Sequence, residues 1–375
     1  MRICIDTSPA VHRRAGLGRY AQELMAALLA ADTDNEYVAF YHRPRDAQID
    51  PPLDRVPHLT TNLDTKPWRF AALFGQSLRI PQDRMFPGID LFHATDHLLP
   101  RLTRVRTVFT LHDLIFRLYP GTHKPLNRWF LTLVMPQFLK AADAVIAVSR
   151  HTKRDAMRFY DLDEAKIHVI YEGVNARFRP APAEAIARVR QAHDLPRKFI
   201  LSLGTIEPRK NLTSLLEAYR GLRDRGSEVR LVIVGKKGWL YEGFFRRLRE
   251  LGLENEVVFT GFVPDADLPA IYSATELFVF PSLYEGFGLP VLEALACGAP
   301  VVTSNTSSLP EVAGDAALLV DPTSVSDLVE AMTTVLESKD VRAELKAKGP
   351  RQASRFSWDK AARQTLAVYQ SVFAR

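Results

Sequence analysis

Two glutamates separated by seven residues lie in the stretch of the sequence that is best suited to chemistry. Glu285 lies in a loop with Gly286 and Gly288, and Glu293 lies about one turn into the helix that we expect to begin at Leu289, on the same face as that residue. Glycines let backbone N–H groups approach a ligand closely, and a helix N-terminus favours an anion. Two spaced carboxylates are acceptors that suit the hydroxyls of a sugar or a ribose. The alternative interpretation is a buried turn with two surface glutamates.

A pair of cations, Arg209 and Lys210, forms a second candidate site. It lies between a predicted strand that ends at Leu203 and a helix that begins near Asn211, a suitable N-cap; Gly204 opens the loop. Two cations in front of a helix suit a diphosphate, because each charged hydrogen bond contributes roughly 1.5–3 kcal/mol. Taken alone, the pair also fits ordinary solvated residues of a loop.

A glycine motif opens the first long helix. Gly16, Gly18 and Ala21 match the dinucleotide fingerprint G-x-G-x-x-A, but the preceding strand is expected to end at Asp6, about nine residues too early for the required tight turn. The acidic residue expected after the second strand is replaced by His42. We therefore predict no NAD site, although Gly16 and Gly18 can still offer backbone amides to a phosphate.

His112 follows an apolar strand, so we expect it at the carboxyl edge of a parallel sheet, where ligands bind. It could act as an acid or base or contact a sugar, although a lone histidine is more often structural. Three Asp-x-Asp pairs, which begin at residues 32, 161 and 265, lie in polar turns where aspartate usually caps a helix. They predict no metal site.

Short β-branched runs alternate with helical patterns along the chain, which is typical of parallel sheets with crossover helices. We expect six strands in each half of the chain. Those of the first half are near Ile3–Asp6, Tyr37–Tyr41, Asp90–His93, Thr107–His112, Ala144–Val148 and His168–Tyr171. Those of the second half are near Phe199–Leu203, Leu231–Gly235, Val257–Thr260, Leu277–Phe280, Pro300–Thr303 and Ala317–Val320. The pattern predicts two doubly wound α/β domains with a ligand in the cleft at their carboxyl strand ends.

A proline-containing stretch near residue 180 marks the expected boundary, which gives domains 1–178 and 179–356. The final segment, 357–375, has an apolar stripe at steps of three and four, which indicates a helix. From this stripe alone, the helix could pack on its own domain or return to the first.

Composition excludes several classes of protein. The 375 residues are 47% hydrophobic and 25% charged, which is typical of a globular protein of two to three domains. The 2 cysteines, Cys4 and Cys297, lie in apolar runs, so we expect no disulfide framework and a reducing compartment. The first residues lack the apolar stretch of a signal peptide, so we expect none, and no apolar run approaches the roughly 20 residues of a membrane span. We therefore expect a cytoplasmic protein.

The net charge of +6 is unevenly distributed. Residues 1–180 hold 25 Lys and Arg against 19 Asp and Glu, whereas the remainder holds 24 of each. A basic first half suggests that it meets an anionic partner, although a solvated surface with a small bias is the plainer alternative. Nucleic acid is disfavoured, because no run of Lys and Arg is interleaved with aromatic residues.

In their joint order, these motifs resemble the retaining glycosyltransferases of family 4, which have the GT-B fold of two Rossmann-like domains facing across a cleft. The resemblance spans nearly the whole chain and is most specific in EGFGLPVLEALACGAPVV. Supporting segments are AGLGRY, TLHD, AVSRHTKRD, GTIEPRKN and SSLPEVAGDAALLVDP. In this family the last helix returns to the first domain, so the resemblance implies that 357–375 completes domain 1–178.

The resemblance also implies roles for residues. Glu285 would bind hydroxyls of the donor sugar and Glu293 those of the ribose, while Arg209 and Lys210 would neutralise the departing diphosphate and His112 would touch the sugar near the reacting carbon. All of these residues except Glu293 form the predicted catalytic set. The remaining donor contacts come from glycine loops, from the start of the helix and from a segment beside the base: Gly16, Gly18, Gly204, Phe262, Val263, Gly286, Phe287, Gly288 and Leu289.

The chain departs from the family pattern at two places. Ala15-Gly16 stands where a glycine pair is common, and Glu172 precedes Gly173 where a smaller or neutral residue is common. Neither departure touches the glutamate pair. The implied reaction is a front-face displacement that retains configuration and needs no metal or cofactor, with the departing phosphate taking the proton of the acceptor.

The donor is inferred by likeness alone. The chain looks most like bacterial mannosyltransferases that use GDP-mannose to build polysaccharides, with UDP-glucose or UDP-N-acetylglucosamine as alternatives. A sugar-nucleotide epimerase of the same fold, a dehydrogenase and a non-catalytic sugar-binding protein are rival classes. The expected acceptor is a glycan or lipid-linked saccharide. The basic first domain predicts contact with the inner face of the membrane, with Arg13, Arg14, Lys124 and Arg128 as candidates.

Overall fold

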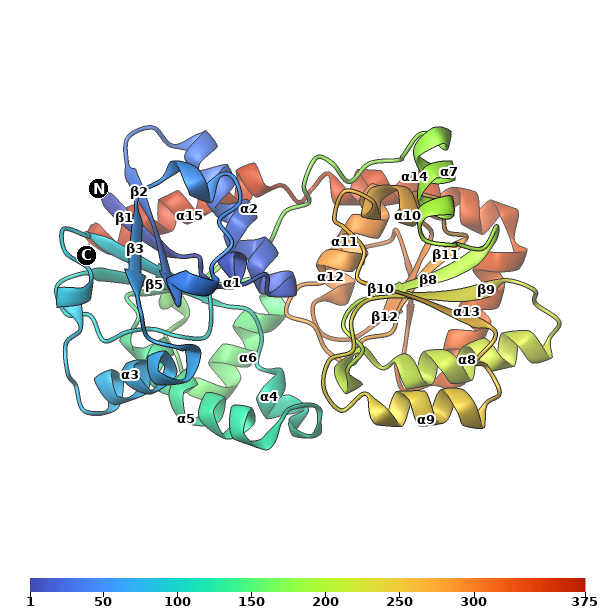
Figure 1. The fold of residues 1–375 in the computed structure, drawn as a ribbon, viewed down its shortest axis with the longest axis horizontal. Helices are drawn as coiled ribbons and strands as arrows, with labels where there is room; N and C mark the ends of the chain where they lie inside the picture. Colours follow the sequence, from blue (N-terminus) through green and yellow to red (C-terminus); the bar gives the residue numbers. More distant parts are fainter. Residues whose placement is uncertain (375) are drawn as a thin grey trace. The chain divides into compact units, whose positions relative to one another are not determined.

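The computed structural model describes residues 1–374, which form two compact units. Unit 1 contains residues 1–118, 125–173 and the chain from Ser357 onward, and unit 2 contains residues 119–124 and 174–356. Each unit is built on one parallel sheet with helices on both faces (Figure 1). The predicted α/β architecture of two doubly wound domains is therefore confirmed.

The sheet of unit 1 has seven parallel strands in the order β3-β2-β1-β4-β5-β6-β7. Its strands are β1 (Arg2–Asp6), β2 (Glu36–His42), β3 (His58–Thr61), β4 (Leu91–Ala94), β5 (Arg106–Leu111), β6 (Ala144–Ala147) and β7 (Ile167–Val169). The order reverses between β1 and β4, which is where a doubly wound sheet binds ligands. The expectation of six strands was wrong, because β3 is a short edge strand with no fully buried residue and lacks the apolar run that marked the others.

The helices of unit 1 cover the two faces of this sheet. They are α1 (Ser8–Val11), α2 (Ala15–Ala31), α3 (Thr65–Ser77), α4 (Ile115–Leu118), α5 (Pro125–Ala141), α6 (Arg150–Tyr160) and α15 (Trp358–Phe373). Figure 1 places α2 and α15 on one side of the sheet and α3 and α5 on the other. The buried stripes of α3 and α5 pack on the strands through Trp68, Phe130 and Phe138.

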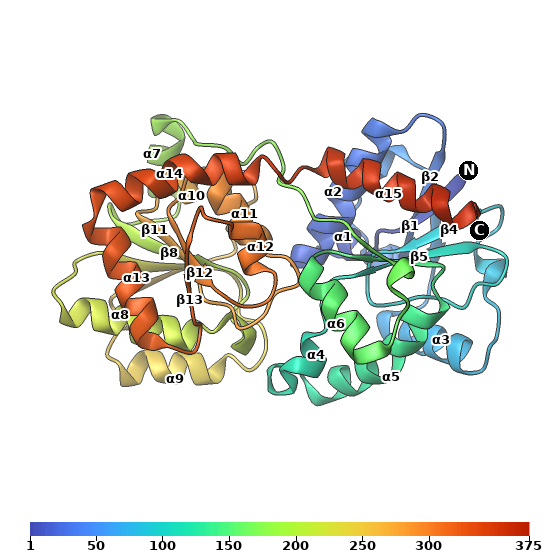
Figure 2. The ribbon, with the colours of Figure 1, turned by 180° about the vertical axis from the view of Figure 1, so that it is seen from behind.

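The last helix, α15, belongs to unit 1 and runs beside α2 (Figure 2). The hydroxyl of Tyr369 lies 2.6 Å from Nδ1 of His93 on β4. At the other end of the helix, a Cβ atom on Gly173 would lie 2.1 Å from the backbone nitrogen of Trp358, so only glycine fits there. The apolar stripe that the sequence shows in this segment is therefore buried on the first sheet.

The sheet of unit 2 has the order β10-β9-β8-β11-β12-β13. All six predicted strands are present, with ends within one residue of those expected: β8 (Phe199–Leu203), β9 (Arg230–Val234), β10 (Val257–Gly261), β11 (Leu277–Phe280), β12 (Val301–Ser304) and β13 (Leu318–Val320). The helices are α7 (Ala183–Ala192), α8 (Leu212–Asp224), α9 (Glu242–Glu250), α10 (Leu268–Ala274), α11 (Leu289–Ala296), α12 (Leu309–Ala313), α13 (Val325–Glu337) and α14 (Lys339–Ala353). The central strands β11 and β12 are buried along their whole length, as their unbroken apolar runs predict.

Both cysteines are buried free thiols, and burial raises the pKa of each. Over residues 1–374, no helix is both long enough and apolar enough to cross a bilayer. Within the same residues, no three His, Cys, Asp or Glu side chains are grouped so that they could hold a metal ion.

Candidate functional site

The loop between β11 and α11 brings backbone amides to the carboxyl edge of the second sheet. Helix α11 begins at Leu289 with Pro290 in its first turn, as predicted. Gly288 precedes it with φ 121°, and a Cβ atom there would lie 2.8 Å from Cδ2 of Leu309. A side chain at this position is therefore opposed both by the backbone conformation and by packing.

Two serines of the segment that leads into α12 hold this loop in place. The hydroxyl of Ser308 donates to the carbonyls of Glu285, at 2.9 Å, and Phe287, at 2.6 Å. The hydroxyl of Ser307 accepts from the backbone N–H of Glu285 at 3.1 Å. The Glu285 backbone is thus fixed from both sides before any ligand binds.

The carboxylate of Glu285 is buried among donors. Nζ of Lys210 lies 2.6 Å from its Oε1, the hydroxyl of Ser282 lies 2.5 Å from the same oxygen, and a guanidinium nitrogen of Arg209 donates to Oε2. Burial by itself raises the pKa of Glu285, but Arg209 and Lys210 together more than offset this and lower the pKa to about 2. Glu285 is therefore an ionised acceptor at any physiological pH.

A second carboxylate, Glu207, completes this network. Its Oε1 accepts from Nε and Nη2 of Arg209 at 3.0 and 2.7 Å, while its Oε2 is buried without a hydrogen-bond partner. Burial raises the pKa of Glu207, although Arg209 opposes the shift. Burial also lowers the pKa of Lys210, as does Arg209, while Glu285 opposes this. Two cations and two carboxylates thus share one buried cluster, which we call the 207–210/285 network.

Sequence reasoning found three of these residues and missed two. Glu207 lies two residues before Arg209 in the same loop, and Ser282 lies three residues before Glu285, so their proximity in sequence was an available signal. Asn211 stands at the N-cap position of α8, as predicted, but its side chain does not cap the helix. It stands before α8 in the left-handed conformation, with φ 54°, and its amide donates to the carbonyl of Pro322 at 2.6 Å, so it caps no N–H of the helix.

Glu293 lies on α11 and is almost completely buried, with 1% of its surface exposed. The hydroxyl of Tyr272, on α10, donates to its Oε2 at 3.1 Å. Since Glu285 is also buried, the alternative interpretation of two surface glutamates is wrong. Two buried carboxyl groups, each hydrogen-bonded to neighbouring side chains, are typical of a functional site.

Two further loops meet at the same edge of the sheet. Gly235 directly follows β9 with φ 150°, and a Cβ atom there would lie 2.0 Å from the carbonyl oxygen of Gly204 after β8. After β10, Phe262 is 64% exposed and Nζ of Lys236 lies 4.6 Å from the centre of its ring, while Val263 is buried. An exposed aromatic face beside a cation is a suitable platform for a planar ring.

In unit 1, His112 lies directly after β5 and is buried. Its Nε2 lies 2.9 Å from the carbonyl oxygen of Thr95, and its Nδ1 lies 3.6 Å from Oε1 of Glu172. Because a carbonyl only accepts, Nε2 carries a proton. Burial by itself lowers the pKa of His112, but Glu172 more than offsets this, so the pKa is raised above 6.5.

The first glycine motif is placed only partly as predicted. Gly16 is exposed in the first turn of α2, where amides lack helical partners. The prediction that the Gly18 amide serves a ligand was wrong, because this amide donates to the carbonyl of Arg14 inside the helix. Gly18 is instead required for packing, since a Cβ atom would lie 2.7 Å from the carbonyl oxygen of Pro9.

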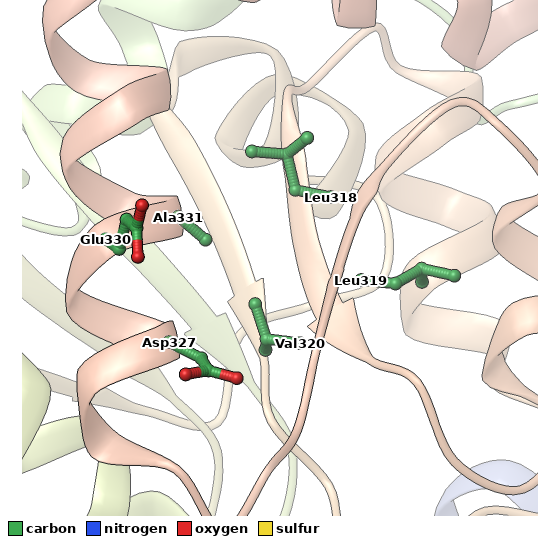
Figure 3. A pocket seen from close by; sticks show the side chains of 6 residues that line it. All are labelled: Leu318, Leu319, Val320, Asp327, Glu330 and Ala331. Atoms are coloured by element: carbon green, nitrogen blue, oxygen red, sulfur yellow. The ribbon is translucent and has the colours of Figure 1, made fainter.

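The structure therefore joins Arg209, Lys210 and Glu285 in direct contact and places Glu293 separately on α11. A shallow depression of about 260 Å³ elsewhere in unit 2 contains none of the predicted residues. Figure 3 shows Asp327 and Glu330 of α13 beside the edge strand β13 in this depression. Nothing in its lining resembles the buried network.

Comparison with known proteins gives two family matches and two informative relatives. Residues 14–178 match the model described as Glycosyltransferase Family 4, and residues 184–352 match that described as Glycosyl transferases group 1. The chain is 30% identical over 387 residues to O-antigen chain mannosyltransferase B of Escherichia coli, covering 99% of this chain and 100% of that protein. It is 36% identical over 260 residues to the serotype-specific mannosyltransferase WbdA of Escherichia coli, covering 68% of this chain and 32% of that longer protein.

Solved structures share the whole fold. Sucrose-phosphate synthase from Thermosynechococcus elongatus superposes with a TM-score of 0.82 at 22% identity, covering 100% of this chain and 99% of that one. Anabaena HepE in complex with UDP-glucose superposes with a TM-score of 0.75 at 20% identity, covering 99% of this chain and 100% of that one. At these identities the likeness establishes the fold alone.

Proposed function

Because the chain belongs to the GT-B glycosyltransferases of family 4, we propose that it transfers a mannosyl unit from GDP-mannose to a hydroxyl of a glycan or lipid-linked saccharide, with retention of configuration. The observation that carries this proposal is the 207–210/285 network, which holds two cations and an ionised acceptor at the carboxyl edge of the second sheet. The choice of mannose is supported by the names of the Escherichia coli relatives, both of which are mannosyltransferases.

The network suits the departure of a diphosphate. As the bond to the anomeric carbon breaks, negative charge grows on phosphate, and fixed cations stabilise it without reorganising. Arg209 and Lys210 are compensated by Glu207 and Glu285, so ion pairs within the protein fix their positions. The amides of Phe287, Gly288 and Leu289 at the start of α11 would add hydrogen bonds to the same charge.

The remaining contacts with the donor would come from the two buried glutamates and from the residues that follow β10. Ionised Glu285 would accept from hydroxyls of the sugar, and Glu293, held by Tyr272, would accept from hydroxyls of the ribose. Phe262 and Val263 would lie beside the base. The parts that Gly16 and His112 of unit 1 play toward the donor stay predictions from the family resemblance.

The proposed reaction has two alternatives. The first is the same transfer with UDP-glucose as the donor, because the HepE structure contains UDP-glucose. The second is a sugar-nucleotide epimerase reaction in this fold, which would consume a nucleotide sugar without any acceptor. If the acceptor is a lipid-linked saccharide, its lipid would hold it at the surface of a membrane.

Thermal unfolding in the presence of GDP-mannose, UDP-glucose, UDP-N-acetylglucosamine, ADP-glucose or NAD tests the donor. At a hundredfold over its dissociation constant, a ligand of the native state adds about 2.7 kcal/mol. We expect a shift with GDP-mannose that disappears in Glu293→Ala and is reduced but retained in Lys210→Ala. The matched controls are Glu337→Ala and Lys339→Ala, because these residues are exposed at the end of α13 and the start of α14.

The other outcomes are equally informative. A shift with a UDP-sugar alone replaces the donor but keeps the site. Conversion of a nucleotide sugar into its epimer without release of a nucleoside diphosphate favours the epimerase. A shift with NAD alone, or no shift with any compound, overturns the donor site.

A further inference from the structure

Helix α3 carries an apolar stripe on its exposed side in addition to its buried one. Phe70 and Phe74 on the helix and Leu78 directly after it are spaced four residues apart and are 50, 54 and 64% exposed. The rings of Phe70 and Phe74 stack with centres 6.2 Å apart. The opposite face of the helix, through Trp68 and Ala72, is buried in the core. The outer stripe therefore contributes no side chain to the core of unit 1.

Helix α5 repeats this arrangement. Leu126, Trp129 and Leu133 recur at helical spacing and are 74, 58 and 40% exposed. Phe130 and Val134 on the inner face are buried in the core. A single exposed apolar side chain is ordinary, whereas a group of them on one face marks a site of interaction.

The two helices lie side by side on the same face of the sheet in both views (Figures 1 and 2). Ser77 of α3 donates to Gln137 of α5 at 3.0 Å. Phe74 lies one turn before Ser77, and Leu133 lies one turn before Gln137, so both exposed stripes border the same seam. We call the six residues of these stripes the α3–α5 surface: Phe70, Phe74, Leu78, Leu126, Trp129 and Leu133.

The charged residues within the two helices have one sign. Helices α3 and α5 contain Lys66, Arg69, Arg128 and Lys140 and no Asp or Glu. Lys66, Arg128 and Lys140 are exposed. Asp64, which precedes α3, is paired with Arg43. Two helices that carry exposed apolar and aromatic side chains and cations, with no carboxylate of their own, match the interface of an anionic bilayer, where rings enter the headgroup region and cations meet phosphates.

We propose that the α3–α5 surface docks unit 1 on an anionic lipid bilayer. A second copy of the chain fits this surface less well, because face-to-face pairing would bring two sets of cations together. The inference deepens the proposed function and rests on it for one point, namely that a lipid-linked acceptor would lie at such a bilayer. It also revises the predicted contacts. Arg14 pairs with buried Asp96, Arg13 lies 3.6 Å from Asp50, and Lys124 belongs to unit 2, whereas Arg128 lies on α5 next to Trp129 of the surface.

Cosedimentation of the full chain with phosphatidylcholine vesicles, with and without phosphatidylglycerol, tests the proposal in the absence of any nucleotide sugar. We expect binding to the anionic vesicles that weakens with salt, because charge attraction contributes. The double variant F74S/W129S should lose this binding. The matched control is Phe373→Ser, since Phe373 is 41% exposed on α15 of the same unit.

The cationic rim has its own variant. Replacing both Lys66 and Arg128 by Gln should lower the partition coefficient on anionic vesicles by about fivefold for each charge removed, with little effect on neutral ones. Since all substituted residues are exposed, the variants should unfold at the wild-type temperature, which confirms that they are folded.

Equal vesicle binding by F74S/W129S and Phe373→Ser would overturn the proposal. So would a wild-type dimer that F74S/W129S converts to a monomer in light scattering, because the occupant would then be a second copy. Thermal shifts with nucleotide sugars separate this result from the proposed function. A variant that still responds to the donor but not to vesicles bears on the α3–α5 surface alone.

Discussion

Nδ1 of His112 lies 3.6 Å from Oε1 of Glu172, and both side chains are buried. Nε2 of the same ring carries a proton because it faces the carbonyl of Thr95. A neutral ring would therefore turn the lone pair of Nδ1 toward a carboxylate oxygen of Glu172, whereas an imidazolium presents a second N–H. Glu172, a departure from the family pattern, thus favours the charged form of His112.

This pair predicts a specific dependence of stability on pH. The pKa of His112 is raised on folding, so its contribution is fully present below the unfolded pKa and is lost as pH rises through the higher folded pKa. The groups that act on His112 are Glu172 and Asp113, which raise its pKa, while His97 and Tyr20 pack against its ring. Glu172→Gln should be less stable than wild type near pH 6 and approach it near pH 9.

Thermal unfolding across this pH range measures the difference. Glu164→Gln is the control, because Glu164 is exposed in unit 1 and its ion pair with Lys153 is worth little. A gap between wild type and Glu172→Gln that stays constant with pH would show that His112 does not titrate with this partner.

Lys210→Ala should reduce turnover more than it reduces donor affinity. The ammonium is compensated by Glu285 in the resting chain and is needed most when charge grows on the leaving diphosphate. We expect kcat to fall by about 10²- to 10³-fold, the size seen when one transition-state donor is removed. Release of nucleoside diphosphate measures it, with Lys339→Ala as the control. A change confined to KM would assign Lys210 to ground-state binding.

Tyr272→Phe tests how Glu293 is held. The substitution removes the hydroxyl that donates to Glu293 at 3.1 Å and should weaken donor affinity by roughly five- to tenfold, equivalent to about 1 kcal/mol. Tyr219→Phe is the matched control, because its hydroxyl donates to the carbonyl of Val229 elsewhere in unit 2. Titration of the nucleotide sugar into both variants separates them. Equal affinities would place Tyr272 among purely structural residues.

Gly235→Ala should be strongly destabilising. A Cβ atom at this position would lie 2.0 Å from the carbonyl oxygen of Gly204, so backbone must move, and we expect a loss of about 3 kcal/mol or more in unfolding free energy. Gly252→Ala is the control, since Gly252 also has a positive φ, of 64°, but a Cβ atom there would meet no atom within 4 Å. Urea unfolding compares them. Similar losses in both would mean that φ, not the contact with Gly204, decides the cost.

Local sequence signals determined most of the architecture of this protein. Every strand with an unbroken apolar run was predicted, as were the helix that begins at Leu289 and the apolar stripe of the last helix. These features depend on neighbours within a few residues, because burial on both faces of a strand requires a continuous apolar run. The polar edge strand β3 has no such run and was missed. Glu285, Glu293 and the Arg209-Lys210 pair were found because glycines and helix starts mark them.

Only the tertiary structure decided which side chains meet. The pairing of Glu285 with Lys210, and of His112 with Glu172, joins residues 75 and 60 positions apart through parallel strands whose order the sequence does not state. It also decided that the Gly18 amide is used inside α2 and that Phe70 and Trp129 face outward, although both helices are apolar on two sides. Periodicity shows that a helix has an apolar face, whereas the sheet on which it packs determines which face is covered.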